Sequence, residues 1–301
     1  MQTTKEAMPK RFVVLELWAS KYYDAKSGQY VGQDRVLKRF KNPACDFVIT
    51  KTRGAVSNQA TINIANLPKA DIEDFTTFRN ETILGGDQRR LALYAGYEGQ
   101  KEARLFTGDI RQALPTVRPD IWLECTCQSG YFNNLGLASL AMNGPIKIKD
   151  IGAKAAQLLN LGYEWRAPEE LNKTIDNFYF TGGITQIMQK LSRLAPLAVW
   201  SEDGVLIIDA ENRSTPLAAG PVLEINKNTG MIGLPRPDIF GVKFTTLLNP
   251  NAKLGQEINL TSEAIPAANG HYFVYGLTHR GNYRGNAFYT EFDCWRFNYA
   301  K

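Results

Sequence analysis

The sequence of 301 residues has little of what membrane proteins, disulfide scaffolds and most metal sites require. It contains no uninterrupted apolar stretch of about 18 residues, so no segment is expected to span a bilayer as a helix. The N-terminal segment Met1–Arg11 lacks the apolar core of a signal peptide. The four cysteines are spread over the whole chain, which favours reduced, buried thiols over a disulfide framework. We therefore expect a protein that is made in a cytoplasm and has no membrane segment.

A clustered basic surface is also absent. The formal charge of +5 is modest for this length, and basic residues alternate with acidic ones rather than forming a block. In the one dense basic stretch, Arg35–Lys41, the charges alternate with apolar residues, which is typical of a half-exposed strand. Nucleic-acid binders usually gather their basic residues into a stripe, so that class of function is not favoured.

What the sequence does contain indicates many short strands. Aromatic residues make up 11% of the chain, and 25 glycines and 14 prolines supply the turns between strands. The hydrophobic fraction of 44% and the charged fraction of 22% are ordinary for a globular protein, which argues against disorder and against a coiled coil. The length allows two or three domains.

Residues 1–140 are predicted to form a first β-barrel domain with one short helix. Ala60–Ile64 alternates strictly between apolar and polar side chains, and Lys69–Phe78 fits an amphipathic helix. Glu98–Lys101 contains a glycine and fits a hairpin connection between two strands. The other strands expected here are Phe12–Trp18, Asp46–Lys51, Arg90–Tyr97, Ala103–Gln112 and Ile121–Gln128.

Residues 141–215 are predicted to form a small α+β insertion domain. Asp150 is expected to cap a helix that ends near Gly162, where a left-handed cap fits. A second helix is expected from Ile184 to Ala195, between two glycines and a proline. Two apolar runs then flank Glu202–Gly204, which indicates a hairpin.

Residues 216–301 return to strands and turns, and they suit a second small closed barrel. The fold class predicted is therefore mainly β, with two small β-barrels flanking an α/β domain. No exact internal sequence repeat is visible, although a barrel at each end is a repeated architecture. The strands expected in this part are Val222–Lys227, Gly241–Leu247, Glu257–Thr261, His271–Thr278 and Ala287–Arg296.

Cysteine and histidine side chains offer few ways to build a catalytic or metal site. Alternation places Cys125 and Cys127 on one apolar strand face, where a core role is favoured. A structural zinc needs four ligands, usually in two close pairs, and the remaining candidates are isolated in the sequence. The two histidines lie at the start and just past the end of one expected strand, where surface or interface hydrogen bonding is favoured. These isolated candidates are Cys45, Cys294, His271 and His279.

Acidic pairs and glycine motifs give no clear site either. Glu169–Glu170 and Glu202–Asp203 could serve a hydrolase that uses two carboxylates, but both stand where solvated acids are common. Gly182–Gly183 precedes a helix without the lysine and hydroxyl residue of a phosphate loop, and Gly85–Asp87 fits a turn. We predict no catalytic, cofactor-binding or metal-binding residue and no enzymatic activity.

Six stretches in consistent order resemble the hub proteins of phage baseplates. The first tube-like barrel of these hubs is resembled by Asn58–Leu67, Leu93–Gly99 and Leu105–Ile110. The second barrel is resembled by Asn228–Pro235, Gly241–Pro250 and Gly276–Gly281. The resemblance covers most of the chain, and the joint order of the motifs carries it.

The resemblance implies a structural hub in the virion tail. Such a hub trimerises, and two barrels per subunit give a ring of six similar parts that joins a hexameric tail tube to a trimeric central spike. The implied partners are further copies of the chain, the tail tube protein, the spike protein, neighbouring baseplate proteins and the tape-measure protein. DNA would only pass through the lumen. No attached lysozyme-like or peptidase segment is seen.

Two alternatives remain open at this point. The first is a tail-associated peptidoglycan hydrolase that uses two acids. The second is a carbohydrate-binding tail module, because aromatic rings can stack on sugars, although core packing is favoured for each of them. The rings considered are Trp18, Trp165, Trp200 and Trp295.

Overall fold

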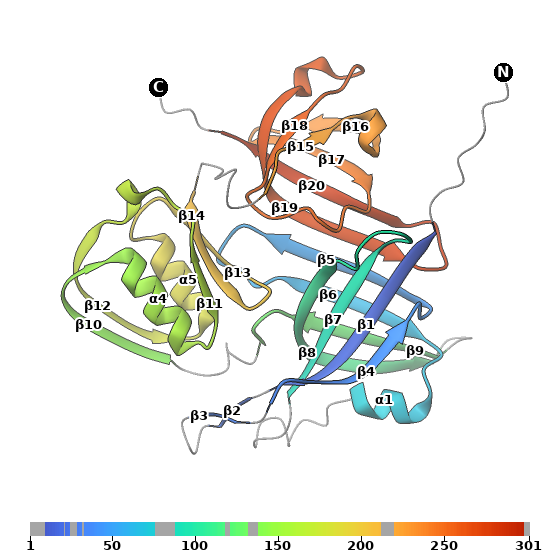
Figure 1. Ribbon diagram of the computed structural model, residues 1–301, viewed down its shortest axis with the longest axis horizontal. Helices are drawn as coiled ribbons and strands as arrows, with labels where there is room; N and C mark the ends of the chain where they lie inside the picture. Colours follow the sequence, from blue (N-terminus) through green and yellow to red (C-terminus); the bar gives the residue numbers. More distant parts are fainter. Residues whose placement is uncertain are drawn as a thin grey trace.

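The computed structural model describes residues 10–20, 22–24, 29–31, 33–75, 88–117, 121–131, 138–211 and 220–297. The chain is mainly β, with a middle part of strands and two helices beside a large sheet (Figure 1). In the N-terminal part the elements are β1 Arg11–Ser20, β2 Tyr22–Asp24, β3 Gln29–Val31, β4 Arg35–Lys41, β5 Cys45–Thr52, β6 Gln59–Ala65, α1 Lys69–Phe75, β7 Gln88–Tyr97, β8 Arg104–Val117 and β9 Ile121–Gln128. Within these ranges, no helix has the length and apolar character needed to cross a membrane.

The middle and C-terminal parts complete the element order. The middle part has β10 Ala138–Lys147, α4 Ile148–Leu158, β11 Gly162–Trp165, β12 Thr174–Gly182, α5 Ile184–Ser192, β13 Leu197–Glu202 and β14 Val205–Ala210. The C-terminal part has β15 Leu223–Ile225, β16 Met231–Pro237, β17 Gly241–Leu247, β18 Glu257–Leu260, β19 Gly270–Asn282 and β20 Phe288–Arg296. Short 3-10 helices occupy Glu169–Leu171, Lys227–Thr229 and Pro266–Ala268.

One 13-stranded sheet runs through both β-rich parts. Eleven of its strands follow the order β16-β17-β20-β19-β5-β6-β9-β8-β7-β1-β4. The other two are β18, which pairs with β19, and β15, which pairs with β18. The N-terminal and C-terminal parts are joined where β5 pairs with β19, from Thr52–Gly276 to Asp46–Asn282. The mainly β class is confirmed, whereas this continuous pairing between the two expected barrel regions was not predicted.

The sheet contains the same strand order twice. The quartet β5-β6-β9-β8 and the quartet β16-β17-β20-β19 each begin with a hairpin and end with a long, bulged strand. The bulge lies between Ile110 and Gln112 in β8, and between Val274 and Gly276 in β19. Just before each bulge the partner residue is a cysteine, Cys127 or Cys294. The repeat is therefore one of topology and register, although no exact repeat is visible in the sequence.

Three buried clusters form the core. The first fills the N-terminal part around Phe47 and Ile62, and the second fills the C-terminal part around Phe244 and Phe292. The third lies in the middle part, where α4 and α5 pack against the sheet β11-β14-β13. The hairpin β13–β14 is apolar on both faces because one face joins the third cluster and the other, with Trp200, joins the second.

The first helix of the middle part differs from the prediction at both ends. Helix α4 begins at Ile148 after Lys147, so Asp150 lies in its first turn and is not the cap. Its negative charge still suits the N-terminal end of the helix dipole. Gly162 opens β11, and the left-handed residue after the helix is Asn160, with a φ of 53°. The second helix and the hairpin around Glu202–Gly204 are confirmed.

Gly281 allows β19 and β5 to approach each other closely. A Cβ atom added at this glycine would lie 2.2 Å from Cζ of Phe47, which is buried in the first cluster. We expect Gly281→Ala to lower the free energy of unfolding by about 1–3 kcal/mol through overpacking. Denaturant unfolding measures this, with Gly54→Ala as the control, because a Cβ there meets only Tyr275 Oη at 3.7 Å. Equal losses in the two variants would contradict the expectation.

Candidate functional site

One face of the eight strands from β16 to β8 is largely polar, although the exposed side chains of Ile232, Leu247 and Leu114 also lie on it. Directly opposed residues in an antiparallel sheet point to the same face, so the pairing register defines rows of side chains. One row across six strands consists of Thr245, Glu291, Thr278, Thr50, Gln59 and Gln128. The next consists of Arg280, Val48, Thr61, Thr126 and Gln112. The opposite face carries the buried apolar side chains of the first two clusters.

Several charges on this polar face form ion pairs with one another. Arg280 donates to Glu291 at 3.0 Å, and Lys243 lies 3.3 Å from both Asp293 and Asp238. These two acids raise the pKa of Lys243, with the charge of Asp293 as the largest cause. The face therefore presents hydroxyl and amide groups and paired ions, with no concentrated charge of one sign among these rows.

The described part of the sheet has open edges at both ends of the eight strands. β16 pairs only with β17, and β8 beyond Asp109 pairs only with β9, because its pairing with β7 ends there. Large apolar side chains are exposed at both places. Ile232 and Leu234 lie on the first edge strand, β16, and Leu114 lies on the second, β8. Leu247 of β17 and Ile121 of β9 are exposed on the neighbouring strands.

A buried polar junction joins the middle part to the sheet. Arg53, which follows β5, donates from Nη2 to Oδ2 of Asp209 at 2.7 Å, and both side chains are 1% exposed. Its guanidinium also lies over the rings of Phe273 and Trp200, 5.0 and 5.4 Å from their centroids. Lys51 pairs with Glu202 at 2.8 Å close by. Arg53 thus contacts all three parts of the chain.

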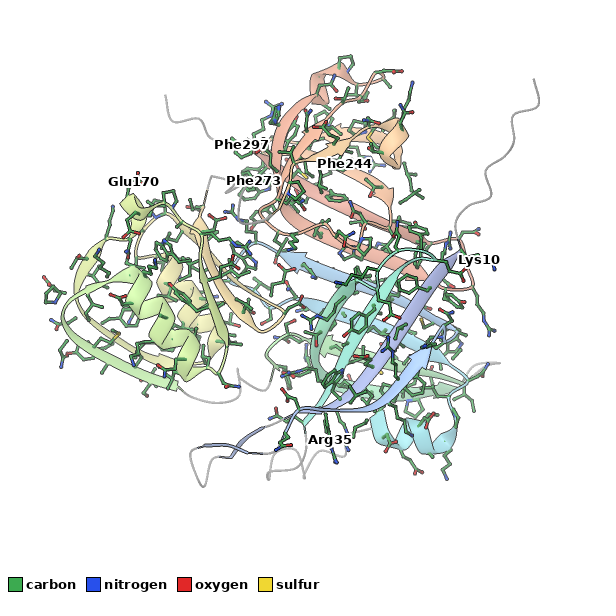
Figure 2. All side chains as sticks on the ribbon, viewed as in Figure 1. Lys10, Arg35, Glu170, Phe244, Phe273 and Phe297 are labelled. Atoms are coloured by element: carbon green, nitrogen blue, oxygen red, sulfur yellow. The ribbon has the colours of Figure 1, made fainter. Side chains whose placement is uncertain are left out.

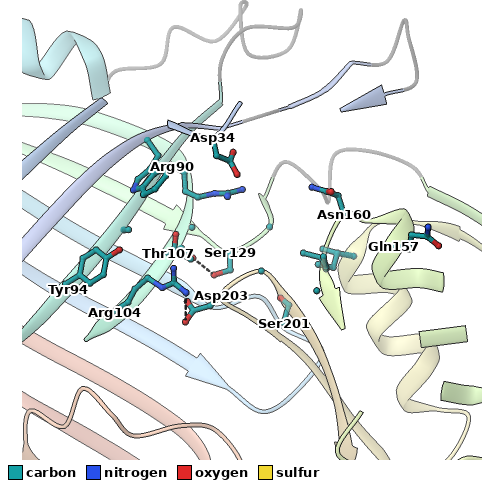
Figure 3. Close-up of a pocket in the computed structure, with 18 residues that line it drawn as sticks. Asp34, Arg90, Tyr94, Arg104, Thr107, Ser129, Gln157, Asn160, Ser201 and Asp203 are labelled. Carbon is teal, nitrogen blue, oxygen red and sulfur yellow. Dashed lines mark hydrogen bonds and ion pairs between the residues drawn. The ribbon is translucent and has the colours of Figure 1, made fainter. Parts of the chain in front are cut away.

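A cleft of about 670 Å³ separates β1, β7 and β8 from the middle part (Figure 3). Its floor holds Trp18 and Tyr94, which both donate to Glu16 at 3.2 Å. On its wall Arg104 lies 3.4 Å from Asp203 of the β13–β14 turn (Figure 3). The ion pair spans the two sides, so the cleft is bordered by fixed charges of both signs.

The thiols considered as ligands are all buried in the cores. Burial raises the pKa of Cys45 and of Cys125 to about 12 and that of Cys127 and Cys294 well above the ordinary value. The predicted core role of Cys125 and Cys127 is confirmed. In the described ranges, no three His, Cys, Asp or Glu side chains gather as a metal site would require.

The surface role predicted for the histidines is wrong for one of them. His271 is exposed and bonds to Glu257 at 2.9 Å. His279 is buried, because β19 continues to Asn282 rather than ending at Thr278. Its Nδ1 lies 2.9 Å from Oγ1 of Thr290, and burial, with a smaller effect of Lys51, lowers its pKa to about 3.

The acidic pairs do not converge on one substrate position. Glu202 reaches Lys51 of β5, whereas Asp203 reaches Arg104 of β8. Glu169 accepts a hydrogen bond from Asn172, which is the largest cause of its lowered pKa, and Glu170 lies on the outside of the middle part (Figure 2). Gly182–Gly183 precedes α5, whose first turn is capped by Gln186 bonding to Gly183. The turn expected at Gly85–Asp87 lies outside the described residues.

Three of the four tryptophans proposed for sugar stacking are held by other side chains. Trp200 is fully buried. Trp295 stacks on Phe240, from the turn before β17, and on Tyr275 of β19, with ring centroids 5.2 and 3.7 Å away. Trp165 packs against the core of the middle part, while Trp18 lines the cleft.

Sequence reasoning missed the polar face and the Arg53 junction. Strict alternation in Ala60–Ile64 already indicated one polar face for β6, and extending it across neighbouring strands would have revealed the rows. The junction left no local signal, since Arg53 and Asp209 are 156 residues apart.

Comparisons with known proteins agree on the class of protein. A family profile described as "Baseplate hub gp41" matches residues 42–294. No curated protein sequence matches the chain significantly. The fold is similar to that of a 43 kDa tail protein of prophage MuSo2 from Shewanella oneidensis, with a TM-score of 0.62 at 10% identity over 95% of this chain and 98% of that one.

Two further solved structures share the fold. A tail protein from Neisseria meningitidis MC58 gives a TM-score of 0.61 at 11% identity, over 94% of this chain and 96% of that one. The third is an Escherichia coli component of the type VI secretion system, itself described as structurally similar to the T4 tail proteins gp27 and gp5. Its TM-score is 0.56 at 10% identity, over 84% of this chain and 73% of that one. Since the profile covers most of the chain, the protein belongs to the baseplate hub family and is a structural component of the phage tail.

Proposed function

We propose that three copies of the chain close into a ring at the end of the tail tube. The observation that carries this is the doubled strand quartet, because three copies of two quartets give six similar units around one axis. Such a ring matches a hexameric tube on one side and a trimeric spike on the other. The fold shared with a protein described as similar to gp27 and gp5 supports this role.

The polar face of the eight strands suits the wall of the channel in this ring. It is continuous across both quartets and carries no large apolar side chain in the row from Thr245 to Gln128. The apolar faces, by contrast, are already buried in the cores of the subunit. DNA would pass along this wall, and a tape-measure protein would occupy it before ejection.

The three parts would then have separate tasks. Residues 1–140 and 216–301 would each contribute one tube-like barrel, and residues 141–215 would stand outside the channel and meet neighbouring baseplate proteins. In this role the protein acts through shape and interfaces, without catalysis, and is assembled in the host cytoplasm before it enters the virion.

The mass and shape of the purified protein test this proposal. We expect a species of three times 33.7 kDa in analytical ultracentrifugation, and ring-shaped particles with a central pore in electron-microscopic class averages. A monomer at every concentration, with no affinity for tube or spike proteins, would contradict the hub role. A cleared band in a peptidoglycan zymogram would favour the hydrolase alternative instead.

A further inference from the structure

We propose that the cleft between β1, β7 and β8 and the middle part binds a short saccharide without net charge. This inference is independent of the proposed ring and adds a binding role to the structural one. The cleft has a volume of about 670 Å³, which lies within the range of small-ligand sites, about 300–1,000 Å³. Its floor carries Trp18, a ring that the channel wall does not use.

Two aromatic rings on the floor are held in place by one carboxylate. Nε1 of Trp18 and Oη of Tyr94 donate to the same oxygen, Oε2 of Glu16, at 3.2 Å each. Glu16 is only 7% exposed, and its other oxygen lies 3.4 Å from Nη1 of Arg39. The polar ends of both rings are thus turned toward Glu16, while the half-buried rings line the cleft. An aromatic surface fixed in this way can pack against the C–H face of a sugar ring.

The charged side chains of the cleft favour a ligand without net charge. Two arginines, Arg90 and Arg104, and two aspartates, Asp34 and Asp203, line it. Arg90 lies 3.2 Å from Asp109, and Arg104 lies 3.4 Å from Asp203 (Figure 3). A charged ligand would therefore meet a group of its own sign beside each group of the opposite sign, and the two effects would largely cancel.

Amide and hydroxyl groups complete the lining. Asn160, which is exposed just after α4, lies across the cleft from Arg90 and Thr107 (Figure 3). Ser129 lies between the two sides and donates to the main-chain oxygen of Thr107 at 2.9 Å. Side chains of this kind both donate and accept hydrogen bonds, as the hydroxyl groups of a sugar do.

The floor suits a sugar better than an extended peptide. A peptide that adds to a sheet requires an open main-chain edge. In the stretch that carries the two rings, β1 pairs with β4 and β7, and β7 pairs with β1 and β8, so both edges of each strand are already used. The floor therefore offers ring faces and side-chain polar groups, which match a ligand that has an apolar ring face and hydroxyl groups around it.

The two sides of the cleft are held at a fixed separation. The β13–β14 turn reaches across, where Asp203 pairs with Arg104 and the preceding Glu202 pairs with Lys51 at 2.8 Å. A site whose walls are already ordered spends little of its binding free energy on closing around a ligand.

Saturation-transfer NMR of the full chain with maltotriose, mannotriose and triacetylchitotriose tests the proposal. We expect magnetisation transfer to the ring protons of at least one of these neutral sugars, and titration of the same signal gives the Kd. Trp18→Ala should raise the Kd about three- to tenfold through the loss of the aromatic contact. A gel that contains the parent polysaccharide identifies the source of the sugar, because retardation of the wild type but not of Trp18→Ala indicates a polymer chain rather than a free oligosaccharide.

A pair of asparagine variants gives a matched control. Asn160 has a φ of 53°, so Asn160→Gly removes the amide without straining the main chain and should raise the Kd about fivefold. Asn177 has a φ of 57° and is exposed on β12, outside the cleft, so Asn177→Gly should leave the Kd unchanged. This pair decides the outcome if Trp18→Ala fails to fold.

The outcomes keep this inference separate from the proposed function. No transfer to any of the three sugars would overturn it, and so would binding that Trp18→Ala and Asn160→Gly leave unchanged. An equal loss of binding in Asn160→Gly and Asn177→Gly would also overturn it, because the effect would then not come from the cleft. A trimeric ring that binds no sugar would leave the hub proposal intact.

Discussion

Replacing Arg53 by methionine is expected to lower the free energy of unfolding by about 3–5 kcal/mol, the cost of breaking a buried ion pair from one side. The guanidinium donates to Asp209 at 2.7 Å and to the carbonyls of Ala210 and Glu211 at 2.5 and 3.0 Å. Burial lowers the pKa of Arg53, and Asp209 opposes that effect. Without the cation, the Asp209 carboxyl group stays buried at 1% exposure and loses the Nη2 donor 2.7 Å away.

Urea unfolding at pH 7 measures this loss, and two further variants identify its cause. Arg53→Lys keeps the charge but cannot form the forked hydrogen bonds, so an intermediate loss is expected. The double variant Arg53→Met/Asp209→Leu buries neither charge and should recover at least half of the stability. A loss below about 1 kcal/mol in Arg53→Met would show that the junction contributes little.

Lowering the pH from 8 to 5 is expected to cost about 2 kcal/mol of unfolding free energy through His279 alone. The pKa of His279 is about 3 in the folded chain, whereas an unfolded histidine titrates near pH 6.5. Between these two pKa values, His279 is therefore protonated in the unfolded chain and neutral in the folded chain. This stability is fully present above about pH 6.5 and is lost as the pH falls toward 3.

The variant His279→Gln isolates this contribution. Its amide can still bond to Oγ1 of Thr290, which lies 2.9 Å from the histidine, but it does not titrate. The free energy of unfolding of the wild type should fall by about 2 kcal/mol more than that of the variant between pH 8 and pH 5. Parallel losses would place the acid sensitivity elsewhere in the chain.

Local sequence patterns correctly predicted those strands and helices whose signals lie within the segment itself and its flanking turns. Gly241–Leu247 alternates and is flanked by turns, and it forms β17 with those bounds. β16 was missed because its two prolines and a glycine are typical of turns, although prolines are tolerated on an edge strand. His279 was misplaced because a polar residue at the end of an apolar run indicates a strand end, whereas the bond to Thr290 allows it to be buried.

Contacts between distant segments could not be predicted from local patterns. The pairing of β5 with β19 joins segments more than two hundred residues apart in the sequence, and only the packing of the whole chain selects it. The same holds for Arg53, whose neighbours suggest an ordinary turn. The polar face could be predicted in part. Alternation within each strand indicates which of its sides is polar, but only the pairing register shows that these sides form one face.

The ion pairs on the polar face affect how strongly a polyanion would be attracted to this surface. A polyanion that meets clustered lysines and arginines releases counterions when it binds, so its affinity depends steeply on salt. Along a wall where Arg280 is matched to Glu291 and Lys243 to Asp293, a polyanion finds no row of unmatched cations. In the proposed ring, DNA that slides past these matched pairs would therefore be attracted to them with little dependence on ionic strength.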